Sequence, residues 1–394
     1  MDIKQIYALV NGATSEVLGK TDLVNEDLSN LVDVGTEIFD SNSQDNYVKS
    51  LVNHIGKVIF VNRPYSGNVP SVLMDSWEFG SVLEKISADI PEATENESWE
   101  LTNGTSYDQD VFYKPTVTAK FFNKRTTYEI PMSFTEKQIK ESFDSATQLN
   151  GFLSMLYNAV DKSMTVKIDS LIMRTIDNMI GETVVADYKE GKNLGALNAK
   201  SGIKAVNLLY LYNQKFGKEL TAAKCVNDAD FIRFATYTIG LYKDRLSKIS
   251  TLFNIGGKER FTSGDHLHIV MLSEFMASAN SYLQSDVFHN ELVALPKAET
   301  VPYWQGSGLD YSFANTSKIN VKTSSGDTLE VTGILGVMFD SEALGVSNLD
   351  RRVTSSYNAK AEFYTNYYKF DAGYYNDLNE NFVVFFVAYH TGRK

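Results

Sequence analysis

One segment in the middle of the chain carries apolar residues at helical spacing without interruption. From Leu149 to Met179 they recur every three or four positions, charged residues lie between them, and the run contains no proline. At 1.5 Å per residue, the helix predicted at 145–181 is roughly 50 Å long, which exceeds the width of a compact domain. Because the sequence predicts no second long helix, we expect the apolar stripe to lie across a β-sheet. The stripe consists of Phe152, Leu156, Val160, Met164, Ile168, Leu171 and Ile176.

The residues before position 64 divide into an arm and a short helix–strand unit. Residues 1–45 are polar, with short helical patches and no core periodicity, so we expect an extended arm that packs on something else. Residues 46–55 predict a short helix, and residues 57–61 predict a strand.

The next segment, 64–130, combines Gly, Pro and acidic residues with two predicted strands at 71–73 and 111–122. It has too few positions of core character to form an independent domain. We therefore interpret it as a long β-hairpin that projects from the body of the protein. Its middle part has seven acidic residues and no Lys or Arg: Asp89, Glu92, Glu95, Glu97, Glu100, Asp108 and Asp110.

Beyond the hairpin, the pattern changes several times. The spacing of Ser133 and Glu136 is that of a capping box and predicts a helix start, and residues 183–186 predict a short strand after the long helix. A compact α/β region follows, with predicted helices at 203–215, 228–248 and 274–284 and predicted strands at 266–272, 318–322, 328–332 and 334–339. The alternating, aromatic-rich segment 359–390 predicts two closing strands joined by a turn at 376–381.

Composition narrows the classes of protein that fit. The 394 residues are 43% hydrophobic with a net charge of −12, which allows a large core and argues against binding nucleic acid through a basic face. The single cysteine, Cys225, excludes an intrachain disulfide and favours a reducing compartment. The start has no signal-peptide pattern, and no apolar run reaches the length of a membrane span.

Catalytic and metal-binding motifs are absent from the sequence. It contains no nucleophile elbow, no phosphate-binding P-loop and no H-E-x-x-H motif. Asp265, His266 and His268 are the nearest approach to a metal site, because residues i and i+2 of a strand share a face. We interpret them as residues at the edge of a strand next to a turn, and Cys225 as a small buried thiol. The acidic segment lacks the ligand order of a calcium loop, so a solvated or Arg-paired surface is favoured. The closing aromatics fit sheet packing better than a sugar-binding platform. We predict no catalytic, cofactor or metal site.

The order of elements resembles that of tailed-bacteriophage major capsid proteins with the Hong Kong 97 fold, and most closely the phi-29-like podovirus capsid proteins. The similarity is carried by NYVKSLVNHIGKVI (46–59), LNGFLSMLYNAVDKSM (149–164), GILGVMFDSEAL (333–344) and EFYTNYYKFDAGYYNDLNENFVVFF (362–386). These are patterns of apolar, Asn and Tyr residues that follow one another through most of the chain.

The resemblance implies an α+β fold with four parts. These are an N-terminal arm (1–45), a peripheral domain with a spine helix over its sheet (46–63, 131–200 and 345–394), a β-hairpin extended loop (64–130) and an axial domain (201–344). It also implies a non-enzymatic, self-assembling icosahedral shell of pentamers and hexamers around the double-stranded DNA of a tailed phage. A scaffolding protein and a portal are the implied partners, and the implied location is the virion, with synthesis in the host cytoplasm. No cofactor and no membrane association are implied.

Charge complementarity suggests which residues meet between subunits. We expect the acidic residues of the hairpin to pair with basic clusters on an adjacent subunit, for which the candidates are Lys124, Arg125, Arg351 and Arg352. The acidic net charge suits an interior that encloses DNA without sequence-specific binding. Two alternatives stay open: an encapsulin-type nanocompartment shell, and a soluble hydrolase or sugar-binding protein. The acidic hairpin and the aromatic ending favour the phage shell.

Overall fold

The computed structural model describes the chain in segments, and these group into two compact units. The described residues are 11–16, 69–74, 83–91, 93, 95, 100, 102–106, 110–135, 146–188, 200–284, 298–305, 312–324, 326 and 328–387. Unit 1 comprises Met1–Phe79, Arg125–Ile172 and Val346–Gly373, and unit 2 comprises Gly80–Lys124, Met173–Gly345 and Tyr374–Lys394. Each unit is thus assembled from three separate stretches of sequence.

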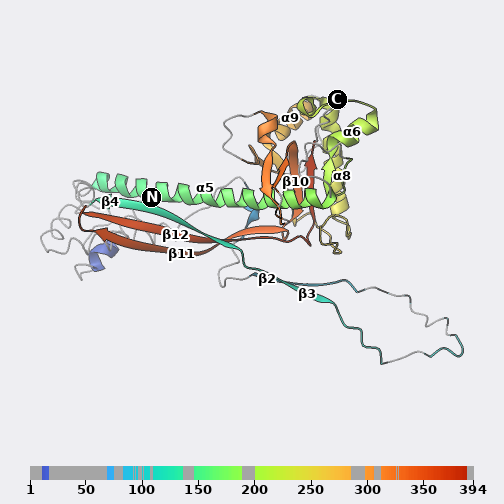
Figure 1. Cartoon of the computed structure of the whole chain (residues 1–394), viewed down its shortest axis with the longest axis horizontal. Coiled ribbons are helices and arrows are strands. Elements are labelled where there is room, and N and C mark those ends of the chain that lie inside the picture. The colour runs from blue at the N-terminus through green and yellow to red at the C-terminus, as the bar shows by residue number, and fades with distance from the viewer. Residues whose placement is uncertain are drawn as a thin grey trace. The chain divides into compact units, whose positions relative to one another are not determined.

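Unit 1 is built on a four-stranded sheet with the order β1-β11-β12-β4 (Figure 1). Its strands are β1 (Leu73–Met74), β4 (Arg125–Thr135), β11 (Leu344–Asn358) and β12 (Phe363–Asn376). β4 runs antiparallel to β12 over eleven consecutive pairs, and β1 is parallel to β11. Tyr364, Tyr368 and Phe370 of β12 are fully buried, because alternate residues of this strand point into the core of the unit.

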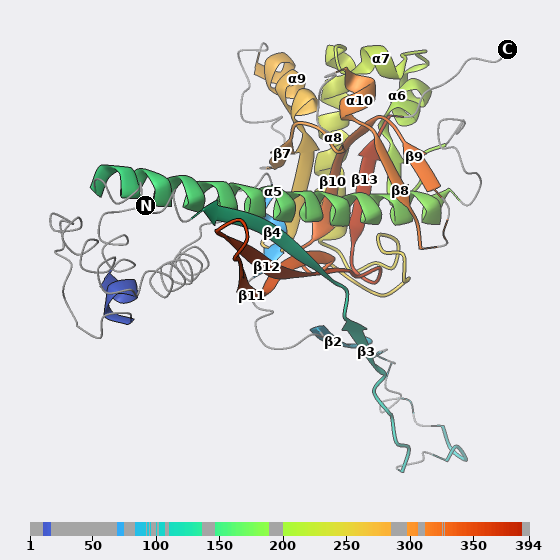
Figure 2. The ribbon, with the colours of Figure 1, turned by 60° about the vertical axis from the view of Figure 1, so that its left-hand side comes forward.

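One uninterrupted helix, α5 (Ala146–Asp187), corresponds to the predicted spine. Its 42 residues give a length of about 63 Å at 1.5 Å per residue. In unit 1 it runs beside β4 and β12 in both views, so the helix lies along the sheet as predicted (Figures 1 and 2). Five residues of the stripe are buried, namely Val160, Met164, Ile168, Leu171 and Ile176. The side chains of Phe152 and Leu156 lie outside the described residues.

The strand predicted at 183–186 is wrong, because these residues form the last turn of α5. The Thr183 hydroxyl donates to the carbonyl of Met179 at 2.8 Å, and Val184 remains fully buried. The β-branched residues that suggested a strand are held in the helix by tertiary packing, which overrides their local preference.

A glycine lets the end of α5 approach the small sheet of β8 (Ile319–Lys322) and β9 (Thr328–Val331). A Cβ atom placed on Gly181 would lie 2.5 Å from Cγ2 of Val321. Beside this contact, the Ser324 hydroxyl donates to Glu182 at 3.0 Å. Only a residue without a side chain permits this spacing.

Unit 2 is built on a five-stranded sheet with the order β5-β13-β10-β6-β7 (Figure 2). Its strands are β5 (Ala205–Asn207), β6 (Leu267–Leu272), β7 (Glu299–Val301), β10 (Ile334–Asp340) and β13 (Phe382–Phe386). The central strand β10 is antiparallel to both neighbours, whereas β5 and β7 pair in parallel at the edges. Every residue of β10 and β13 is buried, which explains why both strands are apolar apart from Asp340 at the end of β10.

Helices pack on this sheet, and the caps of two of them are formed by side chains. They are α6 (Leu208–Phe216), α7 (Ala222–Cys225), α8 (Ala229–Leu246), α9 (Ser273–Gln284) and α10 (Phe313–Thr316). Asn207 caps α6 by accepting from the amide of Tyr210, and Asp228 caps α8 by accepting from that of Phe231. The ring of Tyr242 on α8 meets the edge of Phe385 on β13 at 5.4 Å. The helices predicted at 228–248 and 274–284 are thereby confirmed. Of the segment predicted at 203–215, residues 205–207 are strand and the helix begins at Leu208.

Two other predictions differ from the structure. Ser133 lies in β4 and does not begin a helix, because Ile130, Met132 and Phe134 alternate along a strand that pairs with β12. The described hairpin comprises only β2 (Leu83–Ala88) and β3 (Val117–Phe122), since β1 and β4 from the ends of the 64–130 range pair in the sheet of unit 1. The helix and strand predicted at 46–55 and 57–61 lie outside the described residues, as does most of the arm.

A carboxyl group is buried on α5 without an obvious compensating partner. The side chain of Asp177 is only 3% exposed, and its Oδ1 atom has no hydrogen-bond partner among the described residues. Burial therefore raises the pKa of Asp177 well above its ordinary value. The folded chain holds this proton more tightly than the unfolded chain, so stability falls as pH rises toward the raised pKa.

We expect Asp177→Asn to raise the free energy of unfolding, by about 1–3 kcal/mol near neutral pH. Asparagine keeps the shape of the side chain and removes the cost of ionisation. The measurement is urea unfolding at several pH values between 5 and 8, where the advantage of the variant should grow with pH. Parallel pH profiles for both proteins would contradict the assignment of a protonated Asp177.

Candidate functional site at the hairpin

The hairpin of β2 and β3 projects a ribbon whose two faces differ in chemistry. The strands pair antiparallel from Leu83 opposite Phe122 to Ala88 opposite Val117. The amide of Asp89 continues the ladder by donating to the carbonyl of Thr116 at 2.9 Å. Because successive residues of a strand point to opposite faces, each face takes every second residue of both strands.

The face toward the rest of unit 2, which we call the inner face, is polar. Lys85 and Asp89 of the β2 segment and Lys120 of β3 form ion pairs with the body of the unit. Between them, the hydroxyls of Ser87 and Thr118 lie 3.1 Å apart across the two strands. Apolar packing on this face is confined to the root of the ribbon, where the ring of Phe122 lies 5.0 Å from that of Tyr375.

The opposite, outer face is apolar and exposed. It carries Ile86 and Ile90 of the β2 segment and Val117 and Phe121 of β3, with Ile86 65% exposed and Phe121 63% exposed. Ala88 and Ala119 complete the face, and Glu84 is its charged member. A soluble ribbon normally places its apolar face against its own protein, so this arrangement is reversed.

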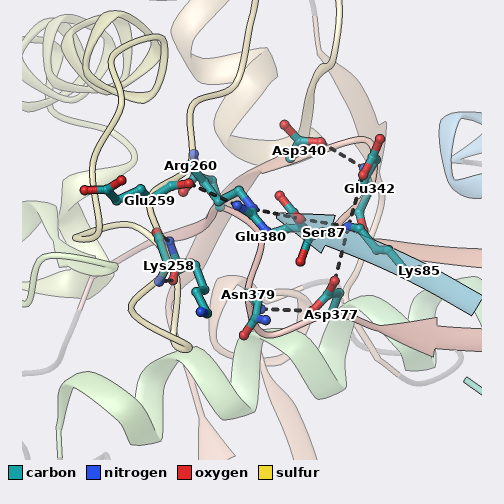
Figure 3. A network of polar contacts seen from close by, with 12 residues as sticks. Lys85, Ser87, Lys258, Glu259, Arg260, Asp340, Glu342, Asp377, Asn379 and Glu380 are labelled. Carbon is teal, nitrogen blue, oxygen red and sulfur yellow. Dashed lines mark hydrogen bonds and ion pairs between the residues drawn. The ribbon is translucent and has the colours of Figure 1, made fainter. Parts of the chain in front are cut away.

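A network of six charged side chains, which we call the ionic clamp, joins the inner face to the turn between β12 and β13 (Figure 3). Nζ of Lys85 lies 3.0 Å from Glu342, 3.1 Å from Asp377 and 2.8 Å from Glu380. Lys120 reaches the other oxygen of Asp377 at 2.8 Å. Arg260 donates from Nε to Glu380 at 3.1 Å. Three cations thus balance three carboxylates: Lys85, Lys120 and Arg260 against Glu342, Asp377 and Glu380.

The pKa values of the clamp follow from this geometry. Burial alone would lower the pKa of Lys85, but its hydrogen bond to Glu380 and the charges of Glu380 and Asp377 outweigh burial and raise it. Burial alone would raise the pKa of Asp377, yet the hydrogen bond from Lys120 and the nearby lysine charges hold it below the ordinary value. Both groups are therefore charged at neutral pH.

The turn that carries the carboxylates is fixed by its own hydrogen bonds. The amide of Asp377 donates to Ala343 at 2.7 Å, and the amide of Asn379 donates to the Asp377 carboxylate at 3.0 Å. The Asn381 side chain donates to Thr262 at 3.2 Å, and the amide of Phe382 donates to Phe253 at 2.9 Å. Asp377 and Glu380 thus belong to a rigid part of unit 2.

Beside the clamp lies an open depression of about 250 Å³, lined by Ile86, Phe261, His266, Glu342 and neighbouring residues. His266 pairs with the hydroxyl of Ser341 at 3.1 Å, and the His268 ring lies 5.7 Å from that of Phe339. Within the part of the chain that the structure describes, no group of three His, Cys, Asp or Glu side chains is placed to hold a metal ion. The two histidines are thus accounted for by hydrogen bonding and packing.

Cys225 is a buried thiol, as predicted from its sequence context. Its Sγ atom donates to the carbonyl of Ala222 at 3.1 Å, and its side chain is fully buried. Burial raises the pKa of this thiol to about 12, so it is protonated and unreactive at neutral pH.

The predicted acidic candidates lie along the hairpin. Asp89 is paired with Lys258 of its own chain at 2.9 Å, whereas Glu95, Glu100 and Asp110 are exposed. The other three candidates lie outside the described residues, namely Glu92, Glu97 and Asp108.

The predicted basic candidates lie in unit 1 or at its border. Lys124 and Arg125 are exposed where the chain enters β4. Arg352 is engaged within its own chain, because its guanidinium lies 3.0 Å from Asp371 of β12. Burial by itself raises the pKa of Asp371, but hydrogen bonds from Arg352 and Thr127 lower it below the ordinary value. The side chain of Arg351 lies outside the described residues.

The clamp residues were not predicted from the sequence. Lys85 alternates with Ile86 in β2, and Lys120 alternates with Phe121 in β3, so a two-faced strand was visible in principle. Their partners Asp377 and Glu380 lie more than 250 residues away in the chain, and no local pattern connects them.

Comparison with known proteins identifies the family. A family model described as Phi29-like phage major capsid protein matches residues 7–386. The chain belongs to this family. The predicted family is thereby confirmed, and the capsid protein has the predicted α+β class with its long helix along a sheet. Among the alternatives, family membership favours the phage shell over the nanocompartment and the soluble hydrolase.

Solved capsid structures are also similar to the capsid protein, at low sequence identity. One is the capsid of Staphylococcus phage Andhra, with 10% identity, coverage of 83% of this chain and 86% of the other, and a TM-score of 0.48. Another is the capsid of the cyanophage P-SCSP1u, with 10% identity, coverage of 84% and 90%, and a TM-score of 0.45. A Mycobacterium phage Che8 structure shares 11% identity over 82% of this chain and 92% of the other, with a TM-score of 0.41. No curated protein matches the sequence.

Among the described residues, no helix of the capsid protein combines the length and the apolar composition that crossing a bilayer requires.

Proposed function

We propose that the capsid protein assembles as pentamers and hexamers into an icosahedral head shell around double-stranded DNA, and that the hairpin connects neighbouring copies. The observation that carries the role of the hairpin is its exposed apolar surface. Residues 86–121 contain seven of the fifteen exposed large hydrophobic side chains among the described residues. Phe112 is 85% exposed and Tyr113 is 84% exposed. Apolar residues clustered this densely on a surface mark an interaction site.

A shell explains both the reversed faces of the ribbon and the charges beyond it. The inner face is engaged by the ionic clamp, and the outer face is left exposed among the described residues, so we expect another molecule to cover it. In a closed shell, each copy meets several neighbours, and modest contacts add up through multivalency. Glu95 and Glu100 are exposed, and we expect them to pair with Lys124 and Arg125 of an adjacent copy. The Asp371 partner of Arg352 makes that residue the weaker candidate.

The remaining parts of the proposal rest on the family resemblance. They are the division into arm, peripheral domain, extended loop and axial domain, assistance by a scaffolding protein and a portal, synthesis in the host cytoplasm, and a structural rather than catalytic role. The net charge of −12 supports a shell that holds DNA without binding it through counterion release.

We expect Phe112→Ser combined with Tyr113→Ser to reduce assembly at least tenfold and leave the monomer folded. Burying one such ring contributes about 1.5–3 kcal/mol to a contact, and its loss is repeated at every hairpin of a shell. Negative-stain electron microscopy and sedimentation velocity measure assembly of the full chain, alone and with a candidate scaffolding protein. The monomer melting temperature should stay within about 2 °C, because both side chains are exposed.

The matched control is Lys248→Ser, a polar change at an exposed position outside the hairpin. It should assemble like the unmodified chain. Equal assembly by the Phe112 and Tyr113 double variant would show that these two side chains are not part of the interface. Failure of the unmodified chain to form rings, sheets, tubes or shells under any condition would overturn the proposed function.

A further inference from the structure

The hairpin belongs to a different compact unit from the strands that precede and follow it in the sequence. β1 and β4 belong to unit 1, whereas residues 80–124 belong to unit 2. On one side, only residues 123 and 124 separate the end of β3 from the start of β4. This short link fixes the root of the hairpin, where the amide of Tyr374 also donates to the carbonyl of Lys124 at 3.1 Å. The direction of the ribbon beyond its root therefore depends on the contacts that it makes within unit 2.

Those contacts are mainly ionic. Along the described ribbon, Lys85 and Lys120 hold the carboxylates of Asp377 and Glu380, and farther out Asp89 holds Lys258. The aromatic contact of Phe122 with Tyr375 lies at the root of the ribbon. It holds the base of the ribbon in place but does little to fix the direction in which the ribbon extends. Removing the charges would leave the ribbon attached at one end only.

The two halves of the clamp differ in stiffness. Two of the carboxylates are buried, with Asp377 only 2% exposed and Glu380 8% exposed, and both sit on the hydrogen-bonded turn between β12 and β13, whereas Glu342 is exposed. The cations on the ribbon are the ends of flexible lysine side chains, Lys85 from β2 (Figure 3) and Lys120 from β3. The rigid carboxylates fix the direction of the ribbon while the two lysines are paired with them. When these ion pairs are broken, the flexible lysine side chains no longer restrain the ribbon.

We propose that the ionic clamp is the device that fixes the direction of the hairpin relative to the body of unit 2. With the clamp closed, the ribbon is held by its polar face, and the apolar outer face is kept free for another molecule. With the clamp open, the hairpin swings about its root and samples many directions. The consequence for assembly rests on the proposed function, but the device itself is a property of the single chain.

Distance measurement by electron–electron double resonance on the full-length monomer tests the device. Spin labels are attached to Thr105→Cys at the hairpin tip and Lys248→Cys on the body, both at exposed positions. Cys225 is fully buried and does not compete for the label. We expect one narrow distance distribution in the otherwise unmodified chain and at least a twofold broader one after Lys85→Met with Lys120→Met. An unchanged width in a folded double variant would overturn the proposal.

Lys120→Met alone is the variant to use if the double variant does not fold. It leaves Asp377 paired with Lys85, so the chain should fold and show intermediate broadening. No broadening in this variant, when the double variant is unfolded, would also overturn the proposal. Lys114→Met, an exposed position on the same hairpin, is the matched control and should not change the distribution. These distances are measured on monomers, so they test whether the ionic clamp fixes the direction of the hairpin even if no shell forms. Conversely, failed assembly with a narrow distribution would count against the proposed function alone.

Discussion

Replacing Gly333 with alanine is expected to lower the free energy of unfolding by about 2–5 kcal/mol, the largest loss of stability from a single methyl group that we anticipate here. Gly333 has a φ of 79°, a conformation that residues with a side chain rarely adopt. A Cβ atom there would also clash with the backbone carbonyl of Val387, which cannot rotate away. Both residues are buried in unit 2. Their backbones are held close together, since the amide of Val387 donates to the carbonyl of Gly333 at 2.8 Å.

Gly326→Ala is the control that separates the two causes. Gly326 has a φ of 89°, but nothing lies within 4 Å of the Cβ atom that alanine would add. This variant should lose only the cost of backbone strain, about 1–2 kcal/mol. Urea unfolding of the monomer measures both variants, and their difference gives the cost of the clash. Equal losses at the two positions would show that strain alone matters and that the Val387 backbone can move.

The parts of the fold that the sequence predicted well are those with a continuous local pattern. The long helix follows from one stripe of apolar residues, and Val160, Met164 and Ile168 of that stripe are fully buried in the structure. Likewise, β10 and β13 follow from short apolar runs, because a strand that is covered on both faces has few polar positions.

The missed elements depend on pairing between distant parts of the chain. β11 has a polar sequence after its first few residues and is a strand because β12 pairs with it, which no local pattern reveals. The capping-box spacing of Ser133 and Glu136 wrongly predicted a helix start, because hydroxyl groups also occupy the exposed positions of a strand. There, Ser133 lies 2.9 Å from Thr365 of β12.

The candidate site shows the same division between local and long-range information. The projecting hairpin could be predicted from the acidic segment and its few core-like positions. Which face of the hairpin points outward could not, because alternation gives two faces but does not say which one meets the protein. The usual assignment places the apolar face inside. Here, the buried carboxylates of Asp377 and Glu380 draw Lys85 inward and leave Ile86 outside.

That reversal leads to the prediction with the largest expected effect on assembly. Ile86→Ser combined with Phe121→Ser should raise the protein concentration needed for assembly by about 30- to 1,000-fold. The two side chains together contribute roughly 2–4 kcal/mol to a contact when another copy covers them, and each 1.4 kcal/mol corresponds to about tenfold in affinity. Light scattering against concentration gives the threshold, and electron microscopy identifies the products.

Glu84→Ser provides the matched control on the same ribbon. Glu84 lies on the outer face directly opposite Phe121, so its replacement changes the same surface without removing apolar area. It should leave the assembly threshold within about threefold, since an exposed charge contributes little to a contact. Both variants should unfold at the urea concentration of the unmodified monomer, because neither position touches the ionic clamp. If the apolar double variant assembles at the normal threshold, the outer face is not an interface between copies, and its exposed apolar residues require another partner. If Glu84→Ser fails equally, charge rather than apolar burial governs the contact.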